Sequence, residues 1–146
     1  MTRLALVVLL LVSGCASPAA PSPSPSQSAP LPSSAAKEPV AVTVTRTGGI
    51  AGIQDTIKVD ASGKWTRQDR GGRLTIEQVT QLQRLATDPR LVAEAAATRP
   101  PTNCADAFDY TVTAGPLTVR YSDCPSDALP PAAAELVSFV VKSIPA

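Results

Sequence analysis

The sequence contains no histidine and few aromatic residues, and both shortages narrow the functions that it can support. Histidine is the commonest general base and a usual zinc ligand, so its absence removes every serine or cysteine nucleophile pair that depends on an imidazole. No glycine-rich phosphate loop followed by lysine occurs, and no cysteine cluster has the spacing of a metal site. Carboxylates remain as candidates, and Asp106 and Asp109 lie near one strand start, but three residues apart in an extended chain they point to opposite faces. The sequence therefore indicates no enzyme, no cofactor and no metal.

An excess of charge of one sign is missing as well. Thirteen Lys and Arg stand against twelve Asp and Glu, for a net charge of +1. No basic or acidic field therefore indicates nucleic acid or an anionic surface as the partner. The most basic stretch surrounds Asp69 and consists of Lys64, Arg67, Arg70 and Arg73. We expect a solvated strand and turn there rather than an anion site.

Long apolar runs are scarce, and the clearest one stands at the amino terminus, where Arg3 precedes an unbroken apolar stretch over residues 4–12. A helix that spans a bilayer needs roughly 20 apolar residues, so this run predicts a secretory signal over residues 1–14 and not a transmembrane anchor. The residues Val12-Ser13-Gly14-Cys15 resemble the bacterial lipobox. The resemblance implies that Cys15 is lipidated and ties the exported chain to the outer face of the bacterial cell membrane. An ordinary secretory signal that ends at a cysteine by chance is the alternative.

Residues 15–39 consist mainly of Pro, Ser and Ala and include a Pro-Ser alternation over residues 21–26. This composition cannot bury enough apolar surface to offset the entropy of the chain. At about 3.1 Å per residue in polyproline II, it predicts an extended tether that holds a domain up to roughly 75 Å from the lipid surface. Residues 40–146 then form one globular domain with a modest core.

A β-hairpin is predicted between residues 104 and 124, where apolar and polar residues alternate on both sides of Ala114-Gly115. If Ala114 and Gly115 form a two-residue turn, three pairs oppose each other on the core face. These pairs are Val112 with Leu117, Tyr110 with Val119, and Phe108 with Tyr121.

The same register brings Cys104 nearly opposite Cys124, and disulfides persist in exported domains. We therefore predict a disulfide between them, which contributes on the order of 3 kcal/mol by closing a loop of about twenty residues. A redox role is disfavoured because the sequence has no Cys-x-x-Cys pair.

Three strands are expected ahead of the hairpin, at residues 40–45, 54–59 and 64–68. The turn between the second and third is Asp60-Ala61-Ser62-Gly63, and Trp65 faces inward on the third, which Arg70-Gly71-Gly72 ends. Thr75 and Gln78 form a capping box for a helix that runs from residue 76 to Asp88-Pro89. A short helical piece follows at residues 90–97.

A final helix begins near Pro130-Pro131, with Asp127 as its cap, and carries an apolar stripe to Ile144. The order of elements predicts an α+β domain, with an antiparallel sheet of about five strands packed against two or three helices.

The segment Arg46-Thr47-Gly48-Gly49-Ile50-Ala51-Gly52-Ile53 stands out because three glycines flank two isoleucines. Glycine permits positive φ and close backbone approach, so one interpretation is a wide turn in which Ile50 packs into the core. The other is a binding loop whose bare backbone lies along a partner while Ile50 or Ile53 enters an apolar pocket. The residues alone leave both open.

This segment, followed by a short acidic strand, a capped helix, a Phe-x-Tyr strand and a closing helix, resembles the emfourin family of thermolysin-like metallopeptidase inhibitors. The resemblance covers residues 41–145, and Asp106, Phe108 and Tyr110 add to it. It implies a small α+β protein, with no metal of its own, that blocks a zinc endopeptidase by occupying the active-site cleft. According to this resemblance, the residues that bind the partner are Arg46, Gly48, Gly49, Ile50, Ala51, Gly52 and Ile53. Asp55, just after this segment, is the nearest carboxylate for an approach to the zinc of the target; the alternative is a solvated side chain, which is usual for a lone strand Asp.

The chain departs from the emfourin pattern in its lipobox, its long tether and its cysteine pair. Two other functions therefore stay open. One is an envelope module that recruits a protein through the same loop without inhibiting it. The other is a carrier of a small apolar ligand, although few aromatic residues argue against a roomy cavity.

Overall fold

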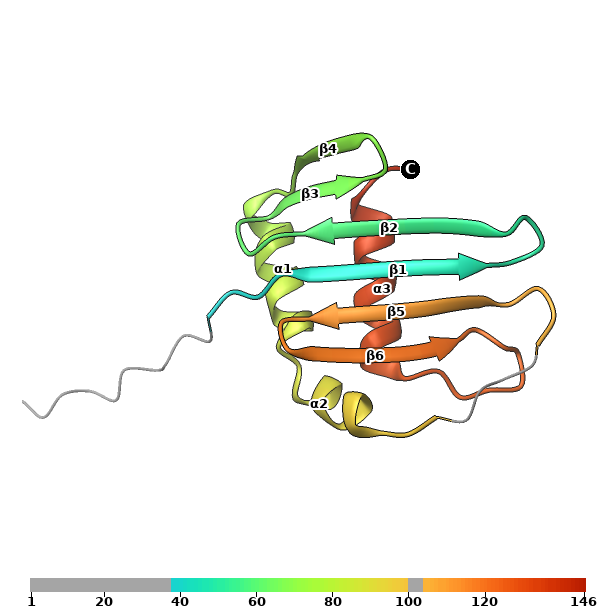
Figure 1. The fold of residues 1–146 in the computed structure, drawn as a ribbon. Helices are drawn as coiled ribbons and strands as arrows, with labels where there is room; N and C mark the ends of the chain where they lie inside the picture. The colour runs from blue at the N-terminus through green and yellow to red at the C-terminus, as the bar shows by residue number, and fades with distance from the viewer. Residues whose placement is uncertain (1–37, 100–103) are drawn as a thin grey trace, which may run out of the picture. The chain divides into compact units, whose positions relative to one another are not determined.

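The computed structural model describes residues 38–99 and 104–146, so the expected signal, Cys15 and almost all of the tether lie outside the described residues (Figure 1). The described chain contains nine elements. They are β1 (Val42–Gly48), β2 (Ile53–Val59), β3 (Lys64–Arg67), β4 (Arg70–Arg73), α1 (Ile76–Ala86), α2 (Pro89–Ala96), β5 (Phe108–Ala114), β6 (Leu117–Ser122) and α3 (Pro131–Ser143).

The strands form one antiparallel sheet in the order β4-β3-β2-β1-β5-β6, and the helices lie on one of its faces (Figure 1). The predicted α+β class is confirmed, with six strands, three helices and one disulfide. The extra strand is β4, whose glycines resemble a turn in the sequence. The turn lies instead at Gln68 and Asp69, since Arg67 pairs with Arg70. Gly72 suits β4 because a Cβ there would lie 2.6 Å from the Trp65 ring.

The hairpin between β5 and β6 exists, but its predicted register is wrong by two residues. Gly115 and Pro116 form the turn, so that Ala114 pairs with Leu117. Gly115 has a φ of 55°, and proline holds φ near −65°. This sign change suits a mirror-image hairpin turn, in which the first central residue takes positive φ. A shift of two residues keeps the same side chains on the inner face, which is why the predicted alternation still holds.

The core lies between the inner face of the sheet and the helices. Alternate residues of the central strands, such as Val42, Val44 and Val112, are almost fully buried there against Leu82 and Leu136. The outer face carries no helix (Figure 1). Threonines dominate this face in the central strands. Among the described residues, no helix is both long enough and apolar enough to cross a membrane.

The helix starts show one correct cap and one wrong one. The capping box of Thr75 and Gln78 is confirmed at α1. Asp127 does not cap α3, because Pro130 occupies the cap position, where it makes no side-chain hydrogen bond. Glu94 of α2 replaces it, accepting hydrogen bonds from the backbone N–H groups of Ala132 and Ala133 at 2.8 and 2.9 Å. One helix is therefore capped by a side chain from another.

The start of β1 is fastened to α1. The N–H of Val40 donates to Oε1 of Gln83 at 2.8 Å, and its carbonyl accepts from Nε2 of the same side chain at 2.9 Å. From there β1 runs through the middle of the sheet, between β2 and β5. Its far end, together with the start of β5, extends past α3, so helices do not cover this end of the sheet (Figure 1).

Candidate functional site

The glycine-rich loop of residues 48–53 joins β1 to β2 at this uncovered end. Its three glycines take φ values of 97°, 68° and 58° at Gly48, Gly49 and Gly52, which L-residues with side chains rarely adopt. Ile50 is 88% exposed at the tip. The alternative in which Ile50 packs into the core is therefore wrong. The loop instead presents an isolated isoleucine side chain to solvent.

The 48–53 loop rests on the chain just ahead of β5. Gly49 donates its N–H to the carbonyl of Ala107 at 2.9 Å, and Gly52 donates to the carbonyl of Gly49 at 3.0 Å. A Cβ on Gly48 would lie 2.6 Å from the Ala107 oxygen, and one on Gly49 would lie 2.5 Å from the ring of Phe108. Glycine is needed at both positions, because of this close approach and because of the positive φ. Ala107 and Phe108 thus hold the loop in place, and we call these two residues its seat.

This seat predicts different outcomes at two glycines of similar φ. Gly49→Ala adds a methyl group against the Phe108 ring, whereas Gly52→Ala adds one to open space. We expect Gly52→Ala to lower the free energy of unfolding by about 1 kcal/mol through backbone strain alone. Gly49→Ala should lower it by about 2–3 kcal/mol because the ring must also move. Urea unfolding of both variants tests this, and equal losses would show that the Phe108 contact is unimportant.

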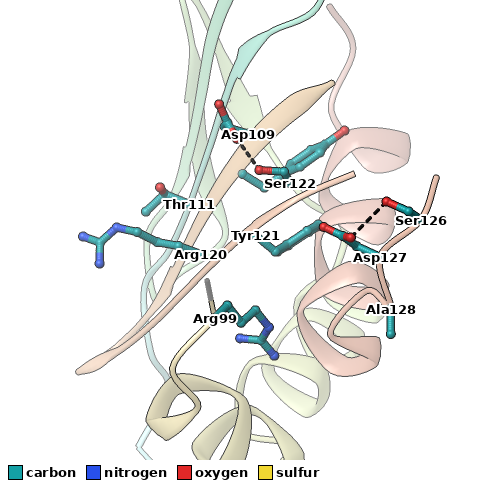
Figure 2. A pocket seen from close by; sticks show the side chains of 10 residues that line it. Arg99, Asp109, Thr111, Arg120, Tyr121, Ser122, Ser126, Asp127 and Ala128 are labelled. Atoms are coloured by element: carbon teal, nitrogen blue, oxygen red, sulfur yellow. Dashed lines mark hydrogen bonds between the residues drawn. The ribbon is translucent and has the colours of Figure 1, made fainter. Parts of the chain in front are cut away.

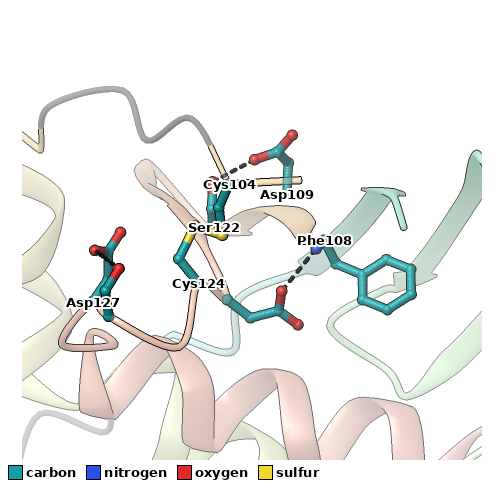
Figure 3. Close-up of a disulfide and its surroundings, with 8 residues drawn as sticks. Cys104, Phe108, Asp109, Ser122, Cys124 and Asp127 are labelled. Atoms are coloured by element: carbon teal, nitrogen blue, oxygen red, sulfur yellow. Dashed lines mark hydrogen bonds between the residues drawn. A yellow bond between two sulfur atoms is a disulfide. The ribbon is translucent and has the colours of Figure 1, made fainter. Parts of the chain in front are cut away.

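The predicted disulfide stabilises the chain that forms this seat. Cys104 and Cys124 are bonded, with their Cα atoms 6.0 Å apart (Figure 3). Asp123, next to Cys124, accepts from the N–H of Phe108 at 2.7 Å and donates its own N–H to the Phe108 carbonyl at 3.0 Å. Residues 104–108 are thus fixed at both ends, and the loop above them is fixed in turn.

Beside the loop lies what we call the aromatic strip, made of Arg46, Phe108, Tyr110 and Tyr121. The guanidinium carbon of Arg46 lies 4.9 Å from the centroid of the Phe108 ring, and the two tyrosine rings stack with centroids 4.9 Å apart. The three rings are three of only five aromatic residues in the chain. They were expected as core pairs. Tyr110 and Tyr121 do pack against the buried core, but all three rings stay partly exposed. Aromatic residues and arginine are enriched at protein–protein interfaces.

Both tyrosines of the strip remain protonated at neutral pH. Burial raises the pKa of the Tyr110 phenol, and Asp123 raises it further while Arg46 lowers it. Burial also raises the pKa of Tyr121, with Tyr110 and Asp123 adding to the effect. The strip therefore presents two uncharged phenols next to one guanidinium group.

Asp55 does not have the role that the sequence suggested. Its side chain is only 5% exposed, and its two oxygens accept from Nε and a terminal nitrogen of Arg67 at 3.0 and 2.6 Å. Arg46 lies 3.6 Å away. The expectation of a solvated Arg67 is wrong for the same reason, and Arg67 also donates to the carbonyl of Ile144 at 2.9 Å. A carboxylate in such a pair is not available to a metal on another protein.

A pocket of about 550 Å³ runs along β6 and is lined mainly by polar side chains (Figure 2). Ser122 donates to Asp109 and Ser126 donates to Asp127, so both carboxylates already have partners. Arg99 lines one end, next to residues 100–103, which lie outside the described chain. Within residues 38–99 and 104–146, no three His, Cys, Asp or Glu side chains gather as a metal site would require.

The structure brings the predicted residues of the loop together with others that the sequence did not indicate. Arg46 and the 48–53 loop form one continuous hairpin end, as the sequence implies. Ala107, Tyr121 and Asp123 join them, but only because β5 pairs with β1, which no local pattern announces. Asp106, which supported the resemblance, is exposed and has a φ of 66°.

Comparisons with models of protein families, with curated proteins and with solved structures find no match to this chain.

Proposed function

We propose that the domain binds another protein through the 48–53 loop and the aromatic strip. The observation that carries this proposal is Ile50, which is 88% exposed at the tip of a loop seated on Ala107 and Phe108. An exposed isoleucine on a fixed backbone loses little conformational entropy on binding, and the exposed glycine backbone beside it offers hydrogen bonds to a partner. Binding hot spots are enriched in tyrosine and arginine, and the strip supplies both residue types beside the loop.

We propose further that the partner is a thermolysin-like zinc metallopeptidase and that binding inhibits it. The resemblance of residues 46–53 to emfourin supports this choice. In this mechanism the hairpin end enters the substrate groove, Ile50 fills an apolar side-chain pocket, and the loop backbone lies along the groove. Because Asp55 is held by Arg67, the block acts by occupying the groove rather than by coordinating the zinc. Lipidation at Cys15 would restrict such inhibition to peptidases at the surface of the cell.

The central test is Ile50→Asp in the full chain. We expect at least thirtyfold weaker inhibition and binding, because a hot-spot side chain contributes about 2 kcal/mol or more and a buried carboxylate would add a desolvation cost. Ile76→Asp is the matched control, since Ile76 is 82% exposed at the start of α1. Ile50→Leu should retain most of the affinity.

Three outcomes separate the functions. If Ile50→Asp abolishes inhibition and Ile76→Asp preserves it, the inhibitor function is supported. A complex that Ile50→Asp abolishes, with every thermolysin-like peptidase left active at excess protein, would assign the chain to non-inhibitory recruitment. If Ile50→Asp and Ile76→Asp bind and inhibit equally well, the 48–53 loop has no part in the function.

A further inference from the structure

A groove of about 280 Å³ opens beside the aromatic strip, between α3 and the uncovered inner face of the sheet. Tyr110 and Tyr121 line its sheet side, and Val137 and Val141 line its helix side. Leu129, which is 43% exposed, also lines the groove. The groove has room for one large side chain and has apolar walls on both sides.

The charges at the groove are not balanced. Arg46 and Lys142 both line it, and Asp123 is the acidic residue that faces them. Asp123 already accepts a hydrogen bond from the backbone of Phe108. Lys142 makes no ion pair with any described residue.

Arg46 is also incompletely satisfied. Asp55, the nearest carboxylate, gives both oxygens to Arg67 and stays 3.6 Å from Arg46. In the described part of the chain, the buried Nε of Arg46 has no hydrogen-bond partner. The groove therefore combines apolar walls with an excess of positive charge among its lining residues, which is complementary to a carboxylate carried on an apolar segment.

The groove and the 48–53 loop are parts of one surface. Arg46 lines the groove and stacks on Phe108, and Phe108 lies under Gly49. A segment of a protein bound at Ile50 can therefore continue into the groove without leaving the surface.

We propose that this groove is a specificity-determining subsite that takes an acidic residue, flanked by apolar residues, from an extended segment of the bound protein. The carboxylate pairs with Arg46 and Lys142, and the flanking apolar side chains lie on Leu129 and Val141. The proposal rests on the proposed protein-binding function and adds the chemistry of the segment that is recognised.

Two blocked synthetic tripeptides test the groove directly, with no need for the natural partner. They are acetyl-Leu-Glu-Leu-amide and its glutamine twin, each titrated into the ¹⁵N-labelled full chain. We expect the glutamate peptide to shift the amide resonances of Arg46, Val141 and Lys142 at concentrations about tenfold lower than its twin, since each tenfold corresponds to about 1.4 kcal/mol. Added salt should reduce this difference.

Lys142→Glu should abolish the preference for the glutamate peptide. Arg84→Glu is the matched control, because Arg84 and Lys142 are each the basic residue in the last turn of a helix. Arg84→Glu should leave the preference unchanged. Equal responses to the two peptides, or shifts confined to other regions, would overturn the proposal, and so would an equally strong response to hexanoate, which would assign the groove to a small apolar acid.

The failure of this subsite is distinguishable from failure of the proposed function. If Ile50→Asp abolishes partner binding but the tripeptides do not discriminate, the loop is retained and the subsite is lost. If the tripeptides discriminate but Ile50→Asp has no effect on partner binding, the proposed role of the loop is lost.

Discussion

Asp55→Ala is expected to lower the free energy of unfolding by about 3–5 kcal/mol, because it leaves a buried guanidinium group without its carboxylate. Arg67 is 7% exposed and makes two hydrogen bonds to Asp55, which is its only carboxylate partner among the described residues. Arg46 lies 3.6 Å from the same carboxylate, so the variant also leaves two positive groups near each other in a partly dry site. The total free energy of unfolding of a small domain is about 5–15 kcal/mol, so urea unfolding should detect this loss clearly.

Two further variants show whether charge burial is the cause. Glu135→Ala removes a carboxylate from an ion pair with Arg90 in which both side chains are more than half exposed, and it should barely change the unfolding midpoint. The double variant Asp55→Leu with Arg67→Met should recover much of the stability that Asp55→Ala loses, because it removes both charges of the buried pair and leaves neither one unpaired. A loss below about 1 kcal/mol for Asp55→Ala would contradict this account.

Glu94→Ala is expected to destabilise the domain by about 3 kcal/mol. The variant strips the caps from two backbone N–H groups at the start of α3, where charge-assisted hydrogen bonds also benefit from the helix dipole. Glu94 is 8% exposed, and its two oxygens accept from Ala132 and Ala133. Pro130 at the cap position makes no side-chain hydrogen bond that would substitute. Thermal unfolding, together with hydrogen exchange at Ala132 and Ala133, measures the effect.

Glu94→Gln is the informative companion variant. Its amide keeps one acceptor oxygen but turns an NH₂ group toward the second backbone N–H, so we expect about half the loss and faster exchange at one of the two alanines. Unchanged exchange at both amides in Glu94→Ala would show that water replaces the carboxylate at no cost.

Local patterns predicted the elements well where one face of each is buried. The alternation in β1, β2 and β5 and the Thr75–Gln78 capping box follow directly from neighbouring residues. The register of β5 and β6 failed because Ala114-Gly115 and Gly115-Pro116 both look like two-residue turns, and a shift of two residues leaves the same side chains facing inward. Strand β4 was missed because Gly71 and Gly72 carry no side chain to alternate.

The candidate site was predictable only in part, because much of it depends on tertiary contacts. The 48–53 loop is continuous in sequence, so its glycines pointed to it. The aromatic strip and the groove depend on where α3 stops covering the sheet, which no periodicity shows. Asp55 was misassigned because its partner Arg67 lies twelve residues away on another strand. Glu94 gives no sign of its role in its own helix, since it caps a different one.

The path of β1 has a mechanical consequence. The chain enters the domain at Val40 and β1 delivers it to the 48–53 loop, so its two ends are the ends at which an anchored protein and its partner would pull. Strand β1 is hydrogen-bonded on both sides, to β2 and to β5. Tension between a membrane anchor and a partner at Ile50 would therefore run along the extended covalent backbone of β1, and the ladders to β2 and β5 would not carry it. Such a load would leave the rest of the sheet unstrained, whereas a pull on an edge strand against the sheet would break its hydrogen bonds one at a time.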